Sequence, residues 1–233
     1  MLNKIVTGIK NYDVSVILTI YNSRKFFLRA LNSVLDQTFT NIEIIIVDDG
    51  STDGSETDLF PLLKENDFIK YIRHSNRKHP LSLNTGIINS TGNFITFIDS
   101  DDEYRSDHIE ERIKYFSENE DADLIYSPAE LIGNDDDMFV PDANDKEKLI
   151  HLNDCIIGGT FFGKRNVFET LNGFKNIYSH DSEFYKRAVD IFNVKKFDLP
   201  TYVYYRDNPD SVISKLKSKM NEQDWMIWIK MNY

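Results

Sequence analysis

Short apolar runs alternate with longer amphipathic segments over the first half of the chain. The runs are rich in Val, Ile and Phe, which is typical of strands buried on both faces of a sheet. They cover residues 14–20, 42–47, 68–73, 94–98 and 124–126. Apolar residues at helical spacing fill the segments between them, at about 24–36, 55–64, 80–90 and 107–117. This alternation predicts an α/β fold in which helices cover a mostly parallel central sheet.

Three of the predicted strands end in polar residues. These residues are Thr19, Tyr21 and Asn22 at the end of the first strand, Asp48 and Asp49 after the second, and Asp99, Ser100, Asp101 and Asp102 after the fourth. Ligands of open α/β sheets bind beyond the carboxyl ends of the strands. We therefore expect these three groups to form one site at that edge of the sheet.

The cluster Asp99, Asp101 and Asp102 places three carboxylates at the end of a rigid element. Like charges held this close repel one another, so the cluster needs a cation or a proton. Carboxylate oxygens suit Mg²⁺ or Mn²⁺, which are usually shared with phosphate groups. The alternative is a solvated acidic turn or a helix N-cap without a ligand.

The second half of the chain has weaker patterns. Two adjacent glycines in 158–163 indicate a close approach of the backbone, either to a ligand or to a bulge in the chain. A helix is expected from Ser179 or His180 to about residue 192, with Asp181 in its first turn, where the helix dipole favours a carboxylate for structural reasons as well. Residues 197–206 are strand-like. The acidic run 133–137 follows no buried strand and is expected to be a solvated loop tip.

Composition limits the classes of partner and the compartment that we expect for this protein. The 233 residues carry a net charge of −11, which argues against nucleic acid, because phosphate binding needs a basic surface. The single Cys155 allows no internal disulfide and suits the cytoplasm. We expect no signal peptide and no membrane-spanning helix. The predicted C-terminal helix, 214–233, combines Trp and Lys residues, and either contacts a membrane surface peripherally, at its inner face, or packs on its own domain or a second chain.

Several motifs in order resemble those of family 2 glycosyltransferases, the inverting nucleotide-sugar enzymes of the GT-A fold. The stretches that carry this resemblance are 14–22, 33–38, 46–53, 84–87, 92–95 and 99–102, with weaker matches at 172–174, 180–181 and 205–206. The resemblance implies a single GT-A domain whose nucleotide-sugar-binding half covers about 12–130 and whose smaller, mixed acceptor-binding half covers about 131–213, followed by the C-terminal helix.

The resemblance also implies roles for individual residues. Thr19, Tyr21 and Asn22 would line the nucleotide, with Tyr21 stacking on the base and Asp49 bonding its edge. Asp99 would face the ribose, Ser100 would also contact the nucleotide, and Asp101 would bind the Mn²⁺ or Mg²⁺ that bridges the diphosphate. Asp181 would be the general base toward a glycan or lipid-linked glycan acceptor. The remaining candidates for donor-sugar or acceptor contacts are Asp102, Gly159, Thr160 and His180.

Three positions depart from the family pattern. Leu83 stands where an Arg is usual before the Asn-X-Gly step, so Arg77, Lys78 or His79 would have to supply that charge. His180 replaces an acidic residue before Asp181, with Glu183 as an alternative base, and Asn208 replaces a His. These departures motivate an alternative, a nucleotide-sugar-binding module that has lost catalysis. A nucleotidyltransferase is disfavoured because the first strand is not followed by a Gly-rich, Lys-containing phosphate loop.

Overall fold

The computed structural model describes residues 10–141, 148–177 and 179–208, and it confirms the predicted α/β fold. Across these ranges the central sheet has seven strands in the order β11-β6-β10-β4-β1-β2-β3. Four parallel neighbours form its nucleus: β1 (Val14–Ile20), β2 (Ile42–Asp48), β3 (Ile69–Arg73) and β4 (Phe94–Asp99). The other three strands are β6 (Leu124–Tyr126), β10 (Phe162–Lys164) and β11 (Val194–Lys196), of which β10 runs antiparallel to both of its neighbours.

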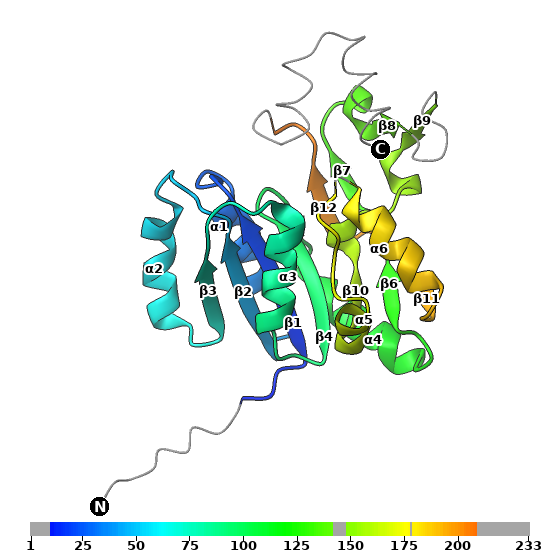
Figure 1. The fold of residues 1–233 in the computed structure, drawn as a ribbon, viewed down its shortest axis with the longest axis horizontal. Helices are drawn as coiled ribbons and strands as arrows, with labels where there is room; N and C mark the ends of the chain where they lie inside the picture. The colour runs from blue at the N-terminus through cyan, green and yellow to red at the C-terminus, as the bar shows by residue number, and fades with distance from the viewer. Residues whose placement is uncertain (1–9, 142–147, 178, 209–233) are drawn as a thin grey trace, which may run out of the picture.

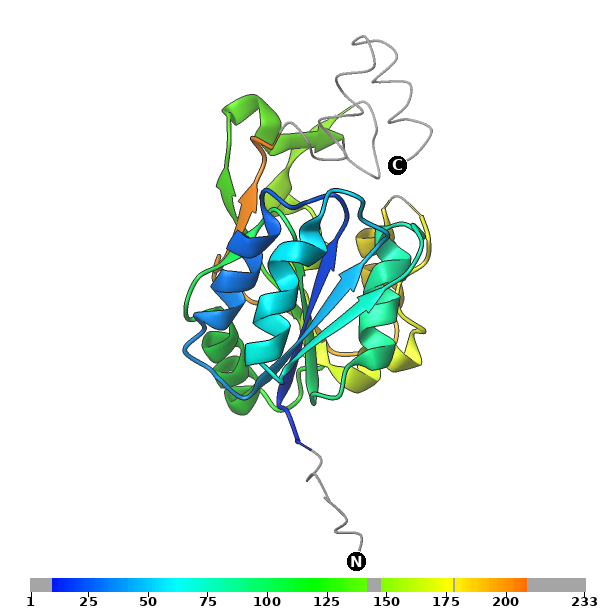
Figure 2. The ribbon, with the colours of Figure 1, turned by 90° about the vertical axis from the view of Figure 1, so that its left-hand side faces the viewer.

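Helices cover both faces of this sheet (Figures 1 and 2). One face is packed by α1 (Phe27–Leu35), α2 (Ser55–Glu65) and α4 (His108–Glu118), and the other by α3 (His79–Asn89), α5 (Arg165–Thr170) and α6 (His180–Val189). Successive residues of a strand point to opposite faces, so each strand contributes to both apolar layers. Leu18 lies in the first layer and Ile17 in the second, which explains why these strands have no polar side.

A smaller sheet lies beyond the carboxyl ends of the central strands (Figure 1). It pairs β5 (Glu103–Tyr104), β12 (Tyr202–Tyr205) and β7 (Glu130–Ile132), and next to it β8 (Phe139–Pro141) pairs with β9 (Leu149–His151). The predicted strand 197–206 is therefore limited to β12. The acidic run 133–137 includes the start of a 3-10 turn, Asp135–Met138, and the two glycines begin another, Gly158–Thr160.

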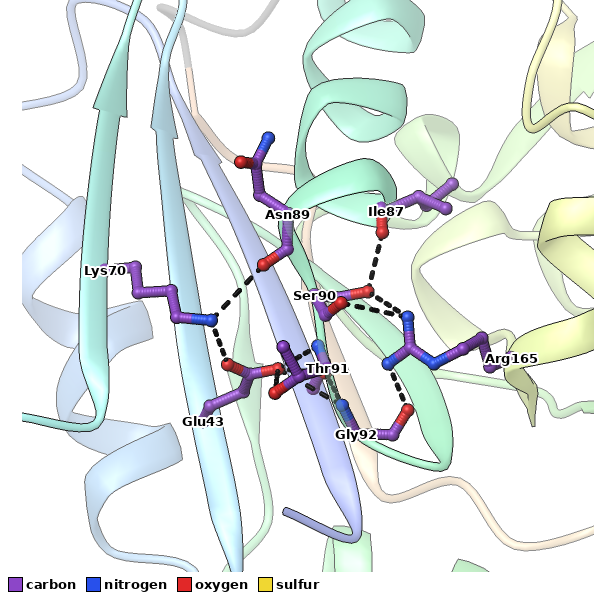
Figure 3. Close-up of polar contacts among 9 residues, drawn as sticks. Glu43, Lys70, Ile87, Asn89, Ser90, Thr91, Gly92 and Arg165 are labelled. Atoms are coloured by element: carbon purple, nitrogen blue, oxygen red, sulfur yellow. Dashed lines mark hydrogen bonds and ion pairs between the residues drawn. The ribbon is translucent and has the colours of Figure 1, made fainter. Parts of the chain in front are cut away.

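The amino edge of the sheet is held by one buried charged residue, Glu43 (Figure 3). Its Oε1 accepts hydrogen bonds from the Ser15 hydroxyl at 2.7 Å and from the backbone and hydroxyl of Thr91, and its Oε2 lies 2.7 Å from Lys70 Nζ. Burial by itself raises the pKa of Glu43, but the hydrogen bonds from Lys70, Ser15 and Thr91 outweigh it and lower that pKa. The loop between α3 and β4 is thereby fixed to three strands.

Arg165 holds the same loop from the side of α5 (Figure 3). Its guanidinium donates to the carbonyl and hydroxyl oxygens of Ser90, both at 3.0 Å, and to the carbonyl of Gly92. Glu43 and Arg165 thus bind neighbouring parts of one turn, which fixes where β4 begins.

Over the described ranges, every helix is too short or too polar to span a membrane. The predicted C-terminal helix, 214–233, lies outside the described residues.

Candidate active site

The candidate site lies where β1 separates two groups of strands. Strands β2 and β3 follow on one side of β1, whereas β4 pairs with its other side. The carboxyl end of β1 is therefore a topological switch point of the sheet. Thr19 is in register with Val47 on β2 and with Asp99 on β4. The predicted polar tips therefore emerge from adjacent strands at one edge of the sheet.

Asp99 ends β4 and faces a histidine from α3. His79 Nε2 lies 3.5 Å from Asp99 Oδ1, and His79 Nδ1 lies 3.1 Å from Thr19 Oγ1. Burial raises the pKa of Asp99 to about 6, while the charge of His180 acts to lower it and that of Asp181 to raise it. Burial lowers the pKa of His79, against the opposing charges of Asp181, Asp101 and Asp49. Carboxylates from three separate segments, after β2, at the end of β4 and in α6, thus act on one imidazole ring.

Asp101 lies in a turn rather than in the strand, because the Asp102 amide donates to the Asp99 carbonyl at 3.1 Å. Asp101 therefore lies beyond the end of β4 and does not share a strand face with Asp99. Asp101 Oδ2 accepts a hydrogen bond from Asn208 Nδ2 at 2.8 Å, and the Asp101 carbonyl accepts one from Arg29. Burial and the charge of Asp99 raise the pKa of Asp101. The loop after β12 thus reaches the predicted metal ligand through Asn208.

Asp102 lies behind this turn and points into the protein, with 1% of its surface exposed. Its Oδ2 accepts from the Tyr202 hydroxyl at 2.6 Å, and its Oδ1 accepts from the Tyr205 amide at 2.9 Å. Burial, followed by the charges of Asp101 and Asp99, raises the pKa of Asp102 well above its usual value. Asp102 thus holds β12 against the acidic turn, residues 99–102. The sequence pattern did not indicate this role.

The loops after β1 and β2 carry the residues that are expected to bind the nucleotide. Tyr21 follows β1 and is 52% exposed, so its ring is open to a ligand. Asn22 Oδ1 accepts from the Thr52 amide at 2.8 Å, which links the loops after β1 and β2. Asp49 accepts from the backbone amides of Arg77 and Lys78, at 2.6 and 3.1 Å, so its carboxylate also orders the loop that leads into His79.

The two adjacent glycines pack on protein groups. A Cβ on Gly159 would lie 2.5 Å from the Tyr202 hydroxyl, so Tyr202 is the neighbour that this backbone approaches. Thr160 is fully buried, where its hydroxyl donates to the Ile157 carbonyl at 2.8 Å and accepts from the Ser127 amide at 3.2 Å. Of this segment it is Gly158 that borders the site, because a Cβ there would lie 3.1 Å from the Cβ of Asp181.

The first turn of α6 brings His180 and Asp181 to the site from the second half of the chain. The His180 ring lies edge-to-face between those of His79 and Phe174, with centroid distances of 5.3 and 5.5 Å. Asp181 Oδ1 accepts from the Ser182 amide at 2.7 Å, a bond that suits the structural role as well as the catalytic one. Ser100 lies in the turn between Asp99 and Asp101, partly exposed.

Glu183, the alternative base, is held in ion pairs. Its carboxylate lies 2.5 Å from Lys175 Nζ and 2.8 Å from an Arg187 nitrogen. Burial acts to raise the pKa of Glu183, but the hydrogen bonds from Arg187 and Lys175 lower it. A carboxylate held in this way is a poor proton acceptor, which favours Asp181 of the two.

Asn84 joins the two halves of the site, a role that its position in an Asn-X-Gly step did not reveal. Its amide donates to the Phe174 carbonyl at 2.7 Å and accepts from the Phe174 amide at 2.8 Å. Gly173 has a φ of +62° and lies so close that a Cβ would reach 2.1 Å from Asn84 Oδ1. Leu83, beside it, is 4% exposed in the apolar layer under α3. Of the three replacements considered for the missing Arg, His79 is the one whose side chain contacts Asp99.

Comparisons with known proteins agree with this geometry. The family described as Glycosyl transferase family 2 matches residues 15–175. The chain is 32% identical over 165 residues to the glycosyltransferase GlyA of Streptococcus pneumoniae serotype 4, an alignment that covers 71% of this chain and 21% of that protein. The chain thus spans about a fifth of the length of this curated relative.

Solved structures share the fold at low sequence identity. Residues 1–349 of S. aureus TarS, in complex with UDP-GlcNAc, superpose with a TM-score of 0.69 at 18% identity, over 94% of this chain and 66% of that one. The mannosyltransferase PcManGT from Pyrobaculum calidifontis, in complex with GDP-Man and Mn²⁺, gives 0.66 at 17% identity, over 88% and 61%.

These structural neighbours confirm the expected GT-A fold. The family match covers more than half of the chain, and it includes β1, β2, β4 and the acidic turn. The chain therefore belongs to glycosyltransferase family 2.

Proposed function

We propose that the protein transfers a sugar from a nucleoside diphosphate sugar, a UDP-sugar, to a hydroxyl group of a glycan or lipid-linked glycan, with inversion at the anomeric carbon. The observation that carries this proposal is the meeting of Thr19, Asp99 and His79 with the first turn of α6 at one switch point. Two halves of the chain contribute to the site, as a reaction between two substrates requires. In this proposal residues 12–130 hold the donor and residues 131–213 hold the acceptor.

The nucleotide side offers an aromatic ring and a carboxylate from the ends of two neighbouring strands. Tyr21 presents an exposed ring for stacking on the base, and Asp49 lies at the end of the next strand. Solved structures of similar fold contain UDP-GlcNAc in one case and GDP-Man in another, which supports a nucleoside diphosphate sugar as donor. The choice of uridine rests on the resemblance to the family.

The residues at the acidic turn fit a shared divalent cation. Among the residues that the structure describes, no three His, Cys, Asp or Glu side chains gather to hold a metal by themselves. Mg²⁺ and Mn²⁺ are commonly held by one or two carboxylates together with substrate phosphates, and Asp101 is such a carboxylate. When bound, the ion would offset the negative charge that develops on the departing nucleoside diphosphate.

Asp181 would accept the proton of the acceptor hydroxyl. As that proton moves to the carboxylate, the hydroxyl oxygen forms a bond to the anomeric carbon from the face opposite the diphosphate. The bond between that carbon and the diphosphate oxygen breaks, and its electron pair leaves with the nucleoside diphosphate. Asp181 lies beside Gly158, where no side chain of that residue obstructs the carboxylate.

The three residues that depart from the family pattern make defined contacts in the structure. Leu83 packs in the core, His180 packs edge-to-face against His79, and Asn208 donates a hydrogen bond to Asp101. None of these contacts removes a carboxylate from the site. We therefore favour the transferase over a binding module without catalysis.

Replacing the proposed base gives the sharpest test. We expect Asp181→Asn to lower turnover by about 10²- to 10⁴-fold, because positioned proton transfer contributes that much, and to leave UDP affinity unchanged. Asp101→Ala should abolish both UDP binding with Mn²⁺ and turnover. The measurements are isothermal titration of UDP with Mn²⁺ and release of UDP from nucleotide sugars with candidate acceptors.

The matched control is Glu183→Gln, two residues along the same helix, which should keep most of the turnover. Full activity in Asp181→Asn would overturn the assignment of the base. UDP and Mn²⁺ binding with no turnover of any nucleotide sugar, in the wild type, would favour the binding module instead.

A further inference from the structure

His79 contacts both parts of the proposed site. It is the first residue of α3, and its Nδ1 meets the hydroxyl of Thr19 at 3.1 Å. Its Nε2 faces Asp99 at 3.5 Å, and its ring packs edge-to-face on the ring of His180. One side chain thus contacts two groups on the donor side and the helix that carries Asp181.

The partners of His79 define its tautomer. A carboxylate only accepts hydrogen bonds, so Nε2 must carry the hydrogen that faces Asp99. Nδ1 is then the acceptor for the Thr19 hydroxyl. The separation of 3.5 Å is longer than a hydrogen bond, and contacts of this kind commonly tighten when substrate binds. We expect this contact to shorten when a donor engages Asp99.

His180 is held from both sides, by His79 and by Phe174. Phe174 is in turn fixed by its two hydrogen bonds to Asn84 on α3. A displacement of the His79 ring therefore acts on His180 against a rigid support. Since Asp181 follows His180 directly in the first turn of α6, the orientation of this turn sets where the carboxylate lies.

We propose that His79 is a positioning residue that links donor binding to the placement of Asp181. Its two nitrogens orient Asp99 and Thr19 for the nucleotide, and its ring, through His180, sets the start of α6. The inference rests on the proposed transferase function, and it gives a positioning role to a residue that the motif pattern named only as a source of charge.

Three substitutions of His79 separate its polar contact with Asp99 from its ring contact with His180. The amide of Gln reaches the position of Nε2 and keeps the contact with Asp99 but has no ring, whereas Phe keeps the ring and has no hydrogen-bonding atoms. We expect His79→Phe to weaken UDP binding with Mn²⁺ about tenfold and to change kcat less than about twofold. His79→Gln should do the reverse, with unchanged UDP affinity and a kcat for UDP-GlcNAc hydrolysis lowered about tenfold. His79→Asn, which reaches only the position of Nδ1, should show both losses.

The same replacements at His151, on β9, provide the control, because this ring packs on Phe139 in the hairpin. Neither His151→Phe nor His151→Gln should change UDP affinity or kcat. Equal effects of His79→Phe and His79→Gln on both quantities would overturn the proposal, since a purely structural role would not separate them. That outcome, in a wild type that binds UDP and turns over, leaves the transferase function intact.

If the wild type shows no turnover, NMR spectra of the protein without ligand still test the role of His79. Long-range ¹⁵N–¹H spectra of the imidazoles should show a neutral His79 ring with its hydrogen on Nε2. The His180 ring resonances should shift in His79→Gln and stay nearly unchanged in His79→Phe. A His79 hydrogen on Nδ1, or His180 resonances that ignore both replacements, would overturn the inference.

Discussion

The two edges of the central sheet hold carboxylates whose pKa values are shifted in opposite directions. At the amino edge, Glu43 is surrounded by hydroxyl and amide donors and by Lys70, which together lower its pKa. At the carboxyl edge, Asp99 and Asp101 crowd together, and burial raises the pKa of both. The sheet therefore carries a hydrogen-bonded carboxylate on β2 at its amino edge and crowded carboxylates after β4 at its carboxyl edge.

The difference teaches how this fold separates stability from binding. A carboxylate that serves the fold is given its donors and its counter-charge by the chain itself. A carboxylate that binds a ligand has a raised pKa in the free protein, because the positive charge that would balance it arrives only with the ligand. Among these acids, Asp102 follows the first pattern in its hydrogen bonds, from Tyr202 and Tyr205, and the second in its pKa.

The largest effect on stability is expected at the amino edge. Glu43→Ala leaves Ser15, Thr91 and Lys70 without their acceptor, so we expect a loss of about 3 kcal/mol in the free energy of unfolding at pH 7. Because the pKa of Glu43 is lowered in the folded state, this contribution is present above the unfolded value of 4.5 and is lost as the pH falls through the folded value. Urea unfolding at pH 7 and at pH 3 measures it.

The control for this variant is Glu65→Ala, at the exposed end of α2, which should change stability little. Turnover per folded molecule should be unchanged in Glu43→Ala. A stable Glu43→Ala protein at pH 7 would contradict the view that this edge is a structural clamp.

Ligand binding should stabilise the protein only through the carboxyl edge. UDP with Mn²⁺ at about 100 times its dissociation constant adds about 2.7 kcal/mol to the free energy of unfolding. Because Glu43 and Asp101 lie at opposite ends of the sheet, we expect the same increment in Glu43→Ala and none in Asp101→Ala. Thermal unfolding with and without UDP and Mn²⁺ tests this, and a smaller increment in Glu43→Ala would show that the edges are coupled.

The smallest effect is expected for Asp99→Asn without ligand, and its sign is opposite to that of Glu43→Ala. The pKa of Asp99 rises from 3.8 to about 6 on folding, so its charged form costs stability as the pH rises through this range. The side chain keeps 40% exposure, which limits the gain in Asp99→Asn at pH 7.5 to less than about 1 kcal/mol. The gain should vanish near pH 4, and a destabilised variant at pH 7.5 would contradict the proposed strain.

Much of the architecture follows from local patterns. The apolar runs predicted the ends of β1, β2, β3, β4 and β6 to within one residue. Strands that are buried on both faces are continuously apolar, which makes them easy to recognise between amphipathic helices. Helices α1, α2, α3, α4 and α6 were also predicted, although α1 begins at Phe27 rather than near Arg24, since residues 24–26 form a turn, and α6 ends at Val189. Strand β10 was missed because three residues around a glycine carry no periodic pattern.

The sequence by itself determined five strands of the central sheet, the edge at which the polar strand ends gather and the family to which the motifs point. These features depend on the spacing of residues that are near one another in the chain. The tertiary structure alone decided that Asp102 and Thr160 turn inward, that Gly159 packs on Tyr202, and that His79 meets Asp99 while Asn208 meets Asp101. Each of these contacts joins separate segments or depends on how they pack, and no local pattern encodes which side chains then face each other.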